Sequence, residues 1–293
     1  MKHRIHSLLV GAMGLASAAF FAVSGASCSQ PTIQCVVGHG AFFARYTPVA
    51  GTDTSCYGLD GEDIGLSTYL APNEDKSLAN YDDRSIAIQS TTLGLLARQR
   101  DGEGFDLGTD KPYAFGKLTT APDANNLCYT GGAEGTAALA QADMNIEAFD
   151  TGEVDDMGNP VILPAAHYRQ QWSNVKMYVT AGVPGTQAVG RMRFEDVLGG
   201  CSAEYTFVAL FPSVYCGKDV DDDNNPDTDA ADDDADTMNP DPQVPEPLFC
   251  AATADPAKGI AVGSGINPDF PVTCDAVTLH CVLSGTPLTG NPE

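Results

Sequence analysis

The chain has 293 residues, and 39 acidic residues against 15 lysines and arginines give a formal net charge of −24 at neutral pH. So negative a chain repels phosphate backbones, which excludes nucleic-acid binding, and it also repels anionic lipid headgroups. Any membrane attachment therefore has to come from a source other than the charged surface. The length suffices for one large β-domain or two small domains with an ample core.

The N-terminal segment has the parts of an export signal. A basic start precedes an uncharged apolar stretch from Leu8 to Val23, and small residues follow it. The apolar stretch is shorter than the roughly 20 residues that a membrane-spanning helix needs. We therefore predict that residues 1–27 are a cleaved signal peptide, with cleavage after Ala26 by ordinary signal peptidase as the alternative.

Cys28 comes directly after these small residues, and the chain holds nine cysteines. An odd number in an exported protein requires an explanation for the leftover thiol. Residues 25–28 resemble the lipobox of bacterial lipoproteins, although Gly25 stands at the usual leucine and Ser27 at the usual glycine or alanine. The resemblance implies an acylated Cys28 and, through Ser29, travel to the outer membrane. The alternative is a secreted chain with a free or intermolecular thiol.

With Cys28 lipidated, eight cysteines remain for four disulfides, which persist in the oxidising compartments that export reaches. The absence of any C-x-x-C pair argues against a zinc site. Eight cysteines allow 105 connectivities, but spacing favours a Cys216–Cys250 bridge across an acidic segment and a local Cys274–Cys281 bridge. The disulfide candidates are Cys35, Cys56, Cys128, Cys201, Cys216, Cys250, Cys274 and Cys281.

Short strand-like runs fill residues 36–117, bounded by glycine, proline, asparagine and aspartate. The clearest runs are Gly40–Thr47, Ile64–Leu70 and Arg84–Gln89. After the third of these runs, the segment Thr91–Arg100 has a threonine at its start, a leucine face and basic residues at its end, which predicts a short helix. A second helix is expected at Glu134–Gln141, and Asp150–Pro160 is expected to be a polar turn region.

Three alternating runs with tight glycine-containing connections predict an antiparallel meander, and its third run should be central because it is continuously apolar. The runs are Asn174–Thr180, Ala188–Phe194 and Ala203–Phe211. Regular short strands of this kind predict a mainly β fold, an antiparallel β-sandwich with one or two short helices, tied by disulfides. After residue 250, strand-like runs resume at Gly259–Val262, Phe270–Cys274 and Val277–Leu283, and the tail Ser284–Glu293 should fray.

The expected domain organisation has four parts. The signal peptide (1–27) precedes a β-sandwich domain (28–216), an acidic loop or linker (217–247) and C-terminal strands (248–293) that complete or extend the sandwich. The acidic part holds eleven aspartates between Asp219 and Asp241, and nothing in it can form a core, so we expect a solvated, disordered loop.

Within the acidic segment, Asp219, Asp221, Asp223 and Asp227 follow the spacing D-x-D-x-D-N-x-x-D. The run resembles the calcium-binding aspartate repeats of thrombospondin type 3 and related extracellular modules, which implies weak calcium binding by these four carboxylates. Asn224 replaces the glycine of the usual sharp turn, and Ala230 replaces the bidentate glutamate. The alternatives are therefore a weak calcium site or a purely structural acidic spacer, and no other cofactor is expected.

The sequence contains no recognisable catalytic motif. His39, His167 and His280 belong to no zinc or nucleophile motif, and paired carboxylates for glycoside hydrolysis cannot be identified from spacing alone. Tyr168 and Trp172 lie in an aromatic and amide-rich segment typical of sugar-binding faces, and equally of sandwich cores.

The whole layout resembles the exported lipoproteins of Gram-negative bacteria, with signal, acylated cysteine, cysteine-paired β-domain and aspartate-rich insertion. We expect a non-catalytic envelope protein, anchored to the outer membrane by lipid or else secreted, that binds a protein or glycan partner or has a structural role. The alternative is a secreted carbohydrate-active enzyme with two carboxylates.

Overall fold

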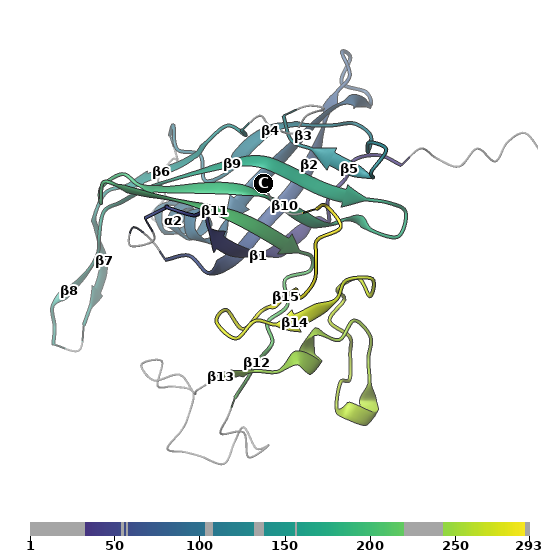
Figure 1. The fold of residues 1–293 in the computed structure, drawn as a ribbon. Helices are drawn as coiled ribbons and strands as arrows, with labels where there is room; N and C mark the ends of the chain where they lie inside the picture. Colours follow the sequence, from purple (N-terminus) through teal and green to yellow (C-terminus); the bar gives the residue numbers. More distant parts are fainter. Residues whose placement is uncertain are drawn as a thin grey trace, which may run out of the picture. The chain divides into compact units, whose positions relative to one another are not determined.

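The computed structural model shows a mainly β protein with antiparallel strands and one α-helix in its described part, which confirms the expected fold class (Figure 1). All the strands lie in the unit Gln34–Glu293. The structure describes residues 33–53, 56, 58–102, 108–131, 138–155, 157–219 and 243–290.

One nine-stranded sheet forms the body of this unit, in the order β4-β3-β2-β1-β11-β10-β9-β5, with β6 also paired to β9. The predicted meander is β9–β10–β11, and β11 is central, as expected. The nine strands are β1 (Gly40–Pro48), β2 (Gly61–Pro72), β3 (Ala79–Ser90), β4 (Ala114–Leu118), β5 (Leu127–Tyr129), β6 (Ala142–Ile146), β9 (Ala166–Val179), β10 (Pro184–Asp196) and β11 (Cys201–Leu210).

The two edges of this sheet meet. The main chain of Phe115 in β4 exchanges hydrogen bonds with Ala140, just before β6, with N···O distances of 3.2 and 2.7 Å. A second bridge joins Leu118 to Thr130 at the end of β5. The two layers expected of a sandwich are therefore parts of one continuous, barrel-like closed sheet, in which β4 has neighbours on both sides.

Alternation along the strands places one set of side chains inside the closed sheet. In β3, Ile86 and Ile88 are fully buried, whereas Ala87 and Gln89 between and after them face outward. The lone tryptophan, Trp172, is fully buried and packs edge-on against Phe207 of β11, with ring centroids 5.1 Å apart. Burying side chains of this size supplies most of the stabilisation of such a fold.

The predicted helix is present as α2 (Thr91–Gly102), directly after β3. Leu93 and Leu96 pack into the interior core, which confirms the expected leucine face. The buried carboxylate of Glu62, at the start of β2, accepts hydrogen bonds from the Thr92 main-chain N–H (2.9 Å) and hydroxyl (2.7 Å). These bonds satisfy a helix N–H that would otherwise lack a partner.

The start of the folded unit is held by a buried cation. Arg84 of β3 donates from Nη1 to the Cys35 carbonyl at 2.7 Å, from Nη2 to the Gln34 side chain, and from Nε to the Tyr81 carbonyl. The Cys35–Cys128 disulfide links the same segment to β5. Burial lowers the pKa of Arg84 from its ordinary value, but the side chain stays a cation at physiological pH.

Two local expectations are wrong. Residues 138–141, the described part of the helix expected at Glu134–Gln141, are not helical, because Leu139 and Ala140 make main-chain hydrogen bonds to Trp172 and Phe115 instead. The polar segment Asp150–Pro160 is mostly strand, in the hairpin of β7 (Phe149–Val154) and β8 (Pro160–Leu163). Its composition predicted the turn at 155–159 but not the paired arms.

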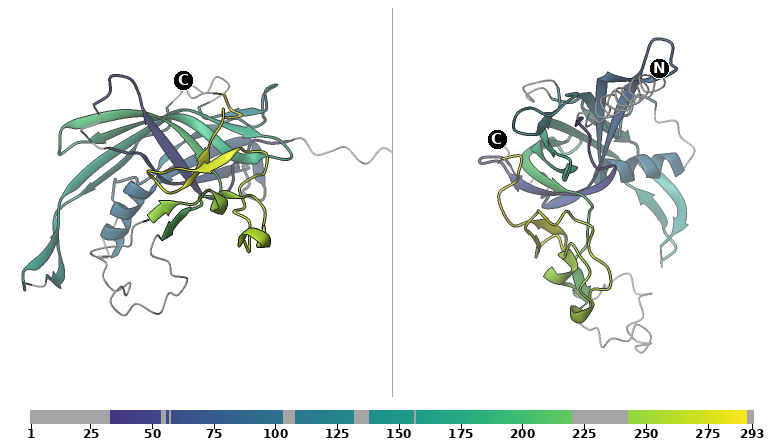
Figure 2. Two further views of the ribbon diagram at one scale, coloured as in Figure 1. Left: turned by 60° about the horizontal axis from the view of Figure 1, so that its bottom comes forward. Right: turned by 90° about the vertical axis from the view of Figure 1, so that its right-hand side faces the viewer.

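The C-terminal part forms a small second core against the outer faces of β1 and β11 (Figure 2). Gly259–Val262 is not a strand, and the expected run at 277–283 forms strand only in its last three residues. The described part of the tail, residues 284–290, does not fray as expected, because Thr289 is buried and its N–H donates to the Gln187 side chain at 3.3 Å. The elements are β12 (Gly217–Asp219), β13 (Gln243–Pro245), β14 (Val272–Cys274), β15 (Cys281–Leu283) and the 3-10 helices η1 (Pro247–Cys250) and η2 (Pro256–Lys258).

Eight cysteines form four disulfides, as expected from their number, but both favoured pairings are wrong. Cys274 and Cys281 do face each other across the β14–β15 hairpin, yet each is bonded elsewhere, to Cys216 and Cys250 respectively. The hairpin is thereby tied to two separate segments. The four bonds are Cys35–Cys128, Cys56–Cys201, Cys216–Cys274 and Cys250–Cys281.

Candidate functional site

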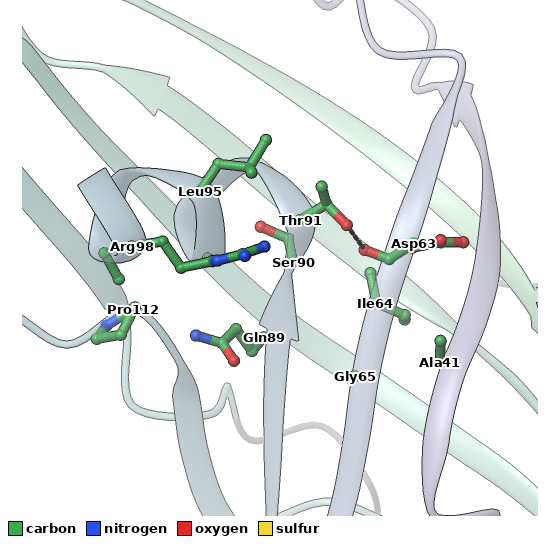
Figure 3. Close-up of a pocket in the computed structure, with 12 residues that line it drawn as sticks. Ala41, Asp63, Ile64, Gly65, Gln89, Ser90, Thr91, Leu95, Arg98 and Pro112 are labelled. Atoms are coloured by element: carbon green, nitrogen blue, oxygen red, sulfur yellow. Dashed lines mark hydrogen bonds between the residues drawn. The ribbon is translucent and has the colours of Figure 1, made fainter. Parts of the chain in front are cut away.

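Two hollows lie on the outer face of the sheet, over strands β2, β3 and β4. The first, which we call the α2 hollow, has a volume of about 580 Å³ and lies between α2 and the ends of β2 and β3 (Figure 3). The second, the aromatic hollow, has a volume of about 690 Å³ and lies over the middle of β3. Volumes of this size are those of small-ligand sites.

The strand register makes the two hollows neighbours on one face. Gly65 of β2 pairs with Gln89 of β3 in the α2 hollow, and two residues along β2, Ser67 pairs with Ala87, which lines the aromatic hollow. The next outward pair is Tyr69 with Ser85. Small side chains thus form a continuous floor, and we call the whole surface the β2–β4 trough.

The α2 hollow combines a cation, an amide and apolar walls. Arg98 and Leu95 enter it from the exposed side of α2, Gln89 comes from β3, and Pro112 lies opposite the helix (Figure 3). Within the described residues, neither the Arg98 guanidinium nor the Gln89 amide has a hydrogen-bond or ion-pair partner in the protein. Both groups are therefore available to a ligand.

The carboxylate of this hollow is already engaged. Asp63 accepts a hydrogen bond from the Ser213 hydroxyl, and Thr91 donates to the Asp63 main-chain carbonyl at 2.9 Å. Figure 3 shows the Asp63 carboxylate pointing away from Arg98. Asp63 therefore fixes the junction between β2 and the segment that follows β11, and it does not pair with Arg98.

The aromatic hollow is walled by exposed rings. Tyr69 of β2 and Phe115 of β4 lie with ring centroids 6.4 Å apart at an angle of 51°, and both rings are about half exposed. Tyr113 adds a third exposed ring, and the Lys117 ammonium forms an ion pair with Asp83 at the rim. Exposed aromatic rings gathered around a hollow are typical of binding surfaces.

The comparisons with known proteins identify the family. The MlpA family model matches residues 40–212, which is more than half of the chain. The chain belongs to the MlpA family. A Myxococcus xanthus protein named "Putative lipoprotein MlpA" is 25% identical over 290 residues, covering 95% of this chain and 93% of that protein. No solved structure matches the chain.

The segment matched by the MlpA family ends two residues after β11, so it contains the closed sheet and every residue of the β2–β4 trough. The C-terminal part with β12 to β15 lies beyond the matched segment. The trough is thus built entirely from the family's own domain. None of the helices described is long and apolar enough to cross a membrane.

The ligand-face candidates from the sequence lie elsewhere. Trp172 is fully buried, so of the two interpretations of its segment, core packing is the one that the structure shows. Tyr168 is half-buried and packs against Phe194, with ring centroids 5.3 Å apart. Neither residue lines either hollow.

The lipid and calcium candidates fall mostly outside the described residues. This applies to Cys28, Asp221, Asp223 and Asp227, whereas Asp219 ends strand β12 and its side chain is not described. In the described residues, the one group of potential metal ligands within 4.8 Å of one another is Cys216, Cys250 and Cys281, and all three sulfurs are in disulfides. Disulfide sulfur is not the thiolate that binds metals.

His167 and His280 have structural partners. His167 Nε2 lies 2.8 Å from Asp143, which also accepts from Arg169 at 2.9 Å. The His280 ring stacks on Phe43 with centroids 4.1 Å apart, and thereby joins the C-terminal part to β1. Neither histidine lines a hollow.

Proposed function

We propose that this protein is a lipid-anchored, non-catalytic protein of the cell envelope that binds a glycan chain in the β2–β4 trough. The name of the Myxococcus xanthus relative and the export segment ending at Cys28 support the anchored lipoprotein. The strand register that places the two hollows side by side along β2 and β3 is the observation that carries the binding site.

The chemistry of the trough favours a glycan over a protein partner. A sugar presents apolar C–H faces and hydroxyl edges, which fit exposed rings such as Tyr69 and Phe115 beside hydrogen-bonding groups such as Gln89. A peptide would gain most from pairing with a free strand edge. The closed sheet leaves no such edge beside the trough, since β4 is bridged to residues 130 and 140.

The lining residues also support a binding role over hydrolysis. Glycoside hydrolysis needs two carboxylates facing each other across the scissile bond, at about 5 to 10 Å. Each hollow is lined by one described carboxylate, Asp63 in the first and Asp83 in the second, and both have partners in the protein.

A lipid on Cys28 would be joined to the folded unit by a short tether. Cys35 lies seven positions after Cys28, and a fully extended chain of that length spans at most about 25 Å. Cys35 itself is held by Arg84 and by its disulfide to Cys128. A lipid on Cys28 would therefore hold the folded unit against the membrane surface, within reach of envelope glycans.

The test is a glycan array followed by titration calorimetry with the best glycan. The protein is the mature chain with Cys28→Ser, which removes the lipid attachment. Phe115→Ala should weaken binding by about five- to 150-fold if a sugar face stacks as well as a nucleic-acid base does, which is worth about 1–3 kcal/mol. Tyr81→Ala is the matched control, since the Tyr81 ring is even more exposed than that of Phe115 but lines neither hollow. Turnover of the glycan, or equal losses in both variants, would refute the proposal.

A further inference from the structure

We infer that the α2 hollow is a carboxylate subsite, so that the glycan is an acidic one, carrying sugar acids. The inference rests on the proposed function, because it names the ligand class of the same trough. It is carried by the Arg98 guanidinium, which lines a hollow and has no hydrogen-bond or ion-pair partner among the described residues.

Arg98 differs from the other arginines with described side chains. Arg45 is paired with Asp60 and Asp275, and the remaining four also have partners within the protein. In a chain with 39 acidic residues, a partnerless guanidinium is the exception. The four others are Arg84, Arg169, Arg191 and Arg193.

Among the described residues that line the hollow, no carboxylate faces this cation. Asp63 is the carboxylate among its lining residues, and it is bonded to Ser213 and turned away from Arg98 (Figure 3). Figure 3 shows the guanidinium extending from α2 over the end of β3, toward Ser90. A planar guanidinium with its fork of N–H donors binds carboxylates bidentately.

Two glycines leave room for a sugar ring beside the guanidinium. A Cβ on Gly65 would meet only the Gln89 carbonyl at 3.8 Å, and one on Gly94 would meet only the Gln89 side chain, also at 3.8 Å. Leu95 and Pro112 supply apolar walls, and the free Gln89 amide can bond a ring hydroxyl. The hollow therefore has the parts that a uronic acid requires.

The subsite is in line with the aromatic hollow. Tyr69 lies four residues after Gly65 in β2, so the two residues are roughly 13 Å apart along the strand. An oligosaccharide lying along β2 and β3 can thus place one residue between Tyr69 and Phe115 and an acidic residue at Arg98. The cation then selects acidic chains in spite of the negative charge of the whole protein.

The experiment is an NMR titration of the mature Cys28→Ser chain with D-glucuronate and with its neutral methyl ester. Glucuronate should shift the Arg98 Nε–H and Gln89 amide signals and bind about fivefold more tightly than the ester, as expected for one exposed ion pair. Arg98→Gln should abolish this preference. Arg193→Gln, which removes the same charge from an exposed site on β10, should retain it.

The outcomes separate the inference from the proposed function. Equal affinities for acid and ester in the trough, or a preference that survives Arg98→Gln, would overturn the acidic subsite and leave glycan binding standing. Failure of both sugars and of all array glycans to shift any trough signal would overturn the proposed function. N-acetylglycine serves as a peptide-like carboxylate. If it binds as tightly as glucuronate does, the subsite does not select sugar acids, and the inference is wrong.

Discussion

The carboxylate of Glu62, buried inside the closed sheet, accepts a hydrogen bond from the Thr92 main-chain N–H at 2.9 Å and thereby joins the start of β2 to the start of α2. The Tyr46 hydroxyl donates to the other oxygen at 2.9 Å, and Gln170 donates to it at 3.3 Å. This network positions the helix that carries Arg98. Forming this network requires the Glu62 carboxylate to be removed from water, which is unfavourable for its charged form.

The burial of Glu62 predicts a pH-dependent stability. Desolvation raises the pKa of Glu62 above its ordinary value of 4.5, and the hydrogen bonds from Thr92, Tyr46 and Gln170 offset this only in part. The unfolded chain therefore loses its proton first, so the contribution of Glu62 to stability is greatest below about pH 4.5 and declines as pH rises through the raised pKa. Urea unfolding of the wild type and of Glu62→Gln measures the effect. The free-energy difference, wild type minus variant, should fall with rising pH, and a flat or rising difference would contradict it.

Arg84 should matter for stability more than an exposed arginine. Arg84→Met would leave the Cys35 and Tyr81 carbonyls without their buried donor, at a cost of about 2–3 kcal/mol in the free energy of unfolding. Arg193→Met, on the exposed side of β10, is the control and should change it by less than about 0.5 kcal/mol. Denaturant titration of both variants measures the difference. Equal effects would show that Arg84 does not hold the N-terminal segment.

Filling the floor of the trough should abolish binding without unfolding the protein. Gly65→Leu places a side chain in the α2 hollow, where its Cβ would meet only the Gln89 carbonyl at 3.8 Å, so glycan affinity should fall at least tenfold while stability changes by about 0.5 kcal/mol. Gly182→Leu, in the turn between β9 and β10, also adds a side chain to open space and should bind as the wild type does. Thermal melts check that both variants are folded, and calorimetry measures their glycan affinity. A folded Gly65→Leu variant that binds as tightly as the wild type would exclude the trough as the binding site.

The disulfide pairing predicts a specific peptide map. Digestion without reduction should release a Cys216–Cys274 and a Cys250–Cys281 pair, and a Cys274–Cys281 peptide would contradict the structure. The Cys250–Cys281 bond closes a loop of 31 residues, so replacing both with serine should cost about 3–4 kcal/mol in the stability of the C-terminal part.

Local patterns predicted the strands well and the site not at all. The alternation of Arg84 to Gln89 predicts β3 because one face of that strand is buried in the core. Closure of the sheet depends on main-chain bridges such as Phe115 with Ala140, which no side-chain pattern records. Cysteine spacing likewise failed, because the bonds join segments that only the fold brings together.

The trough escaped prediction for a related reason. Gly65, Ser67 and Ala87 are unremarkable in sequence, and their register on adjacent strands is what makes a floor. Trp172 attracted attention as the lone tryptophan, but the alternation of β9 turns it inward. One signal was available: Tyr69 and Phe115 are large apolar rings at the polar-facing positions of their strands.

The most direct test of glycan binding in the β2–β4 trough is to map the bound glycan by NMR on the mature Cys28→Ser chain. With the best glycan from the array, the shifted signals should cluster at Tyr69, Gln89, Arg98, Tyr113 and Phe115. Shifts confined to other surfaces, such as the β7–β8 hairpin or the segment around Tyr168, would contradict the account.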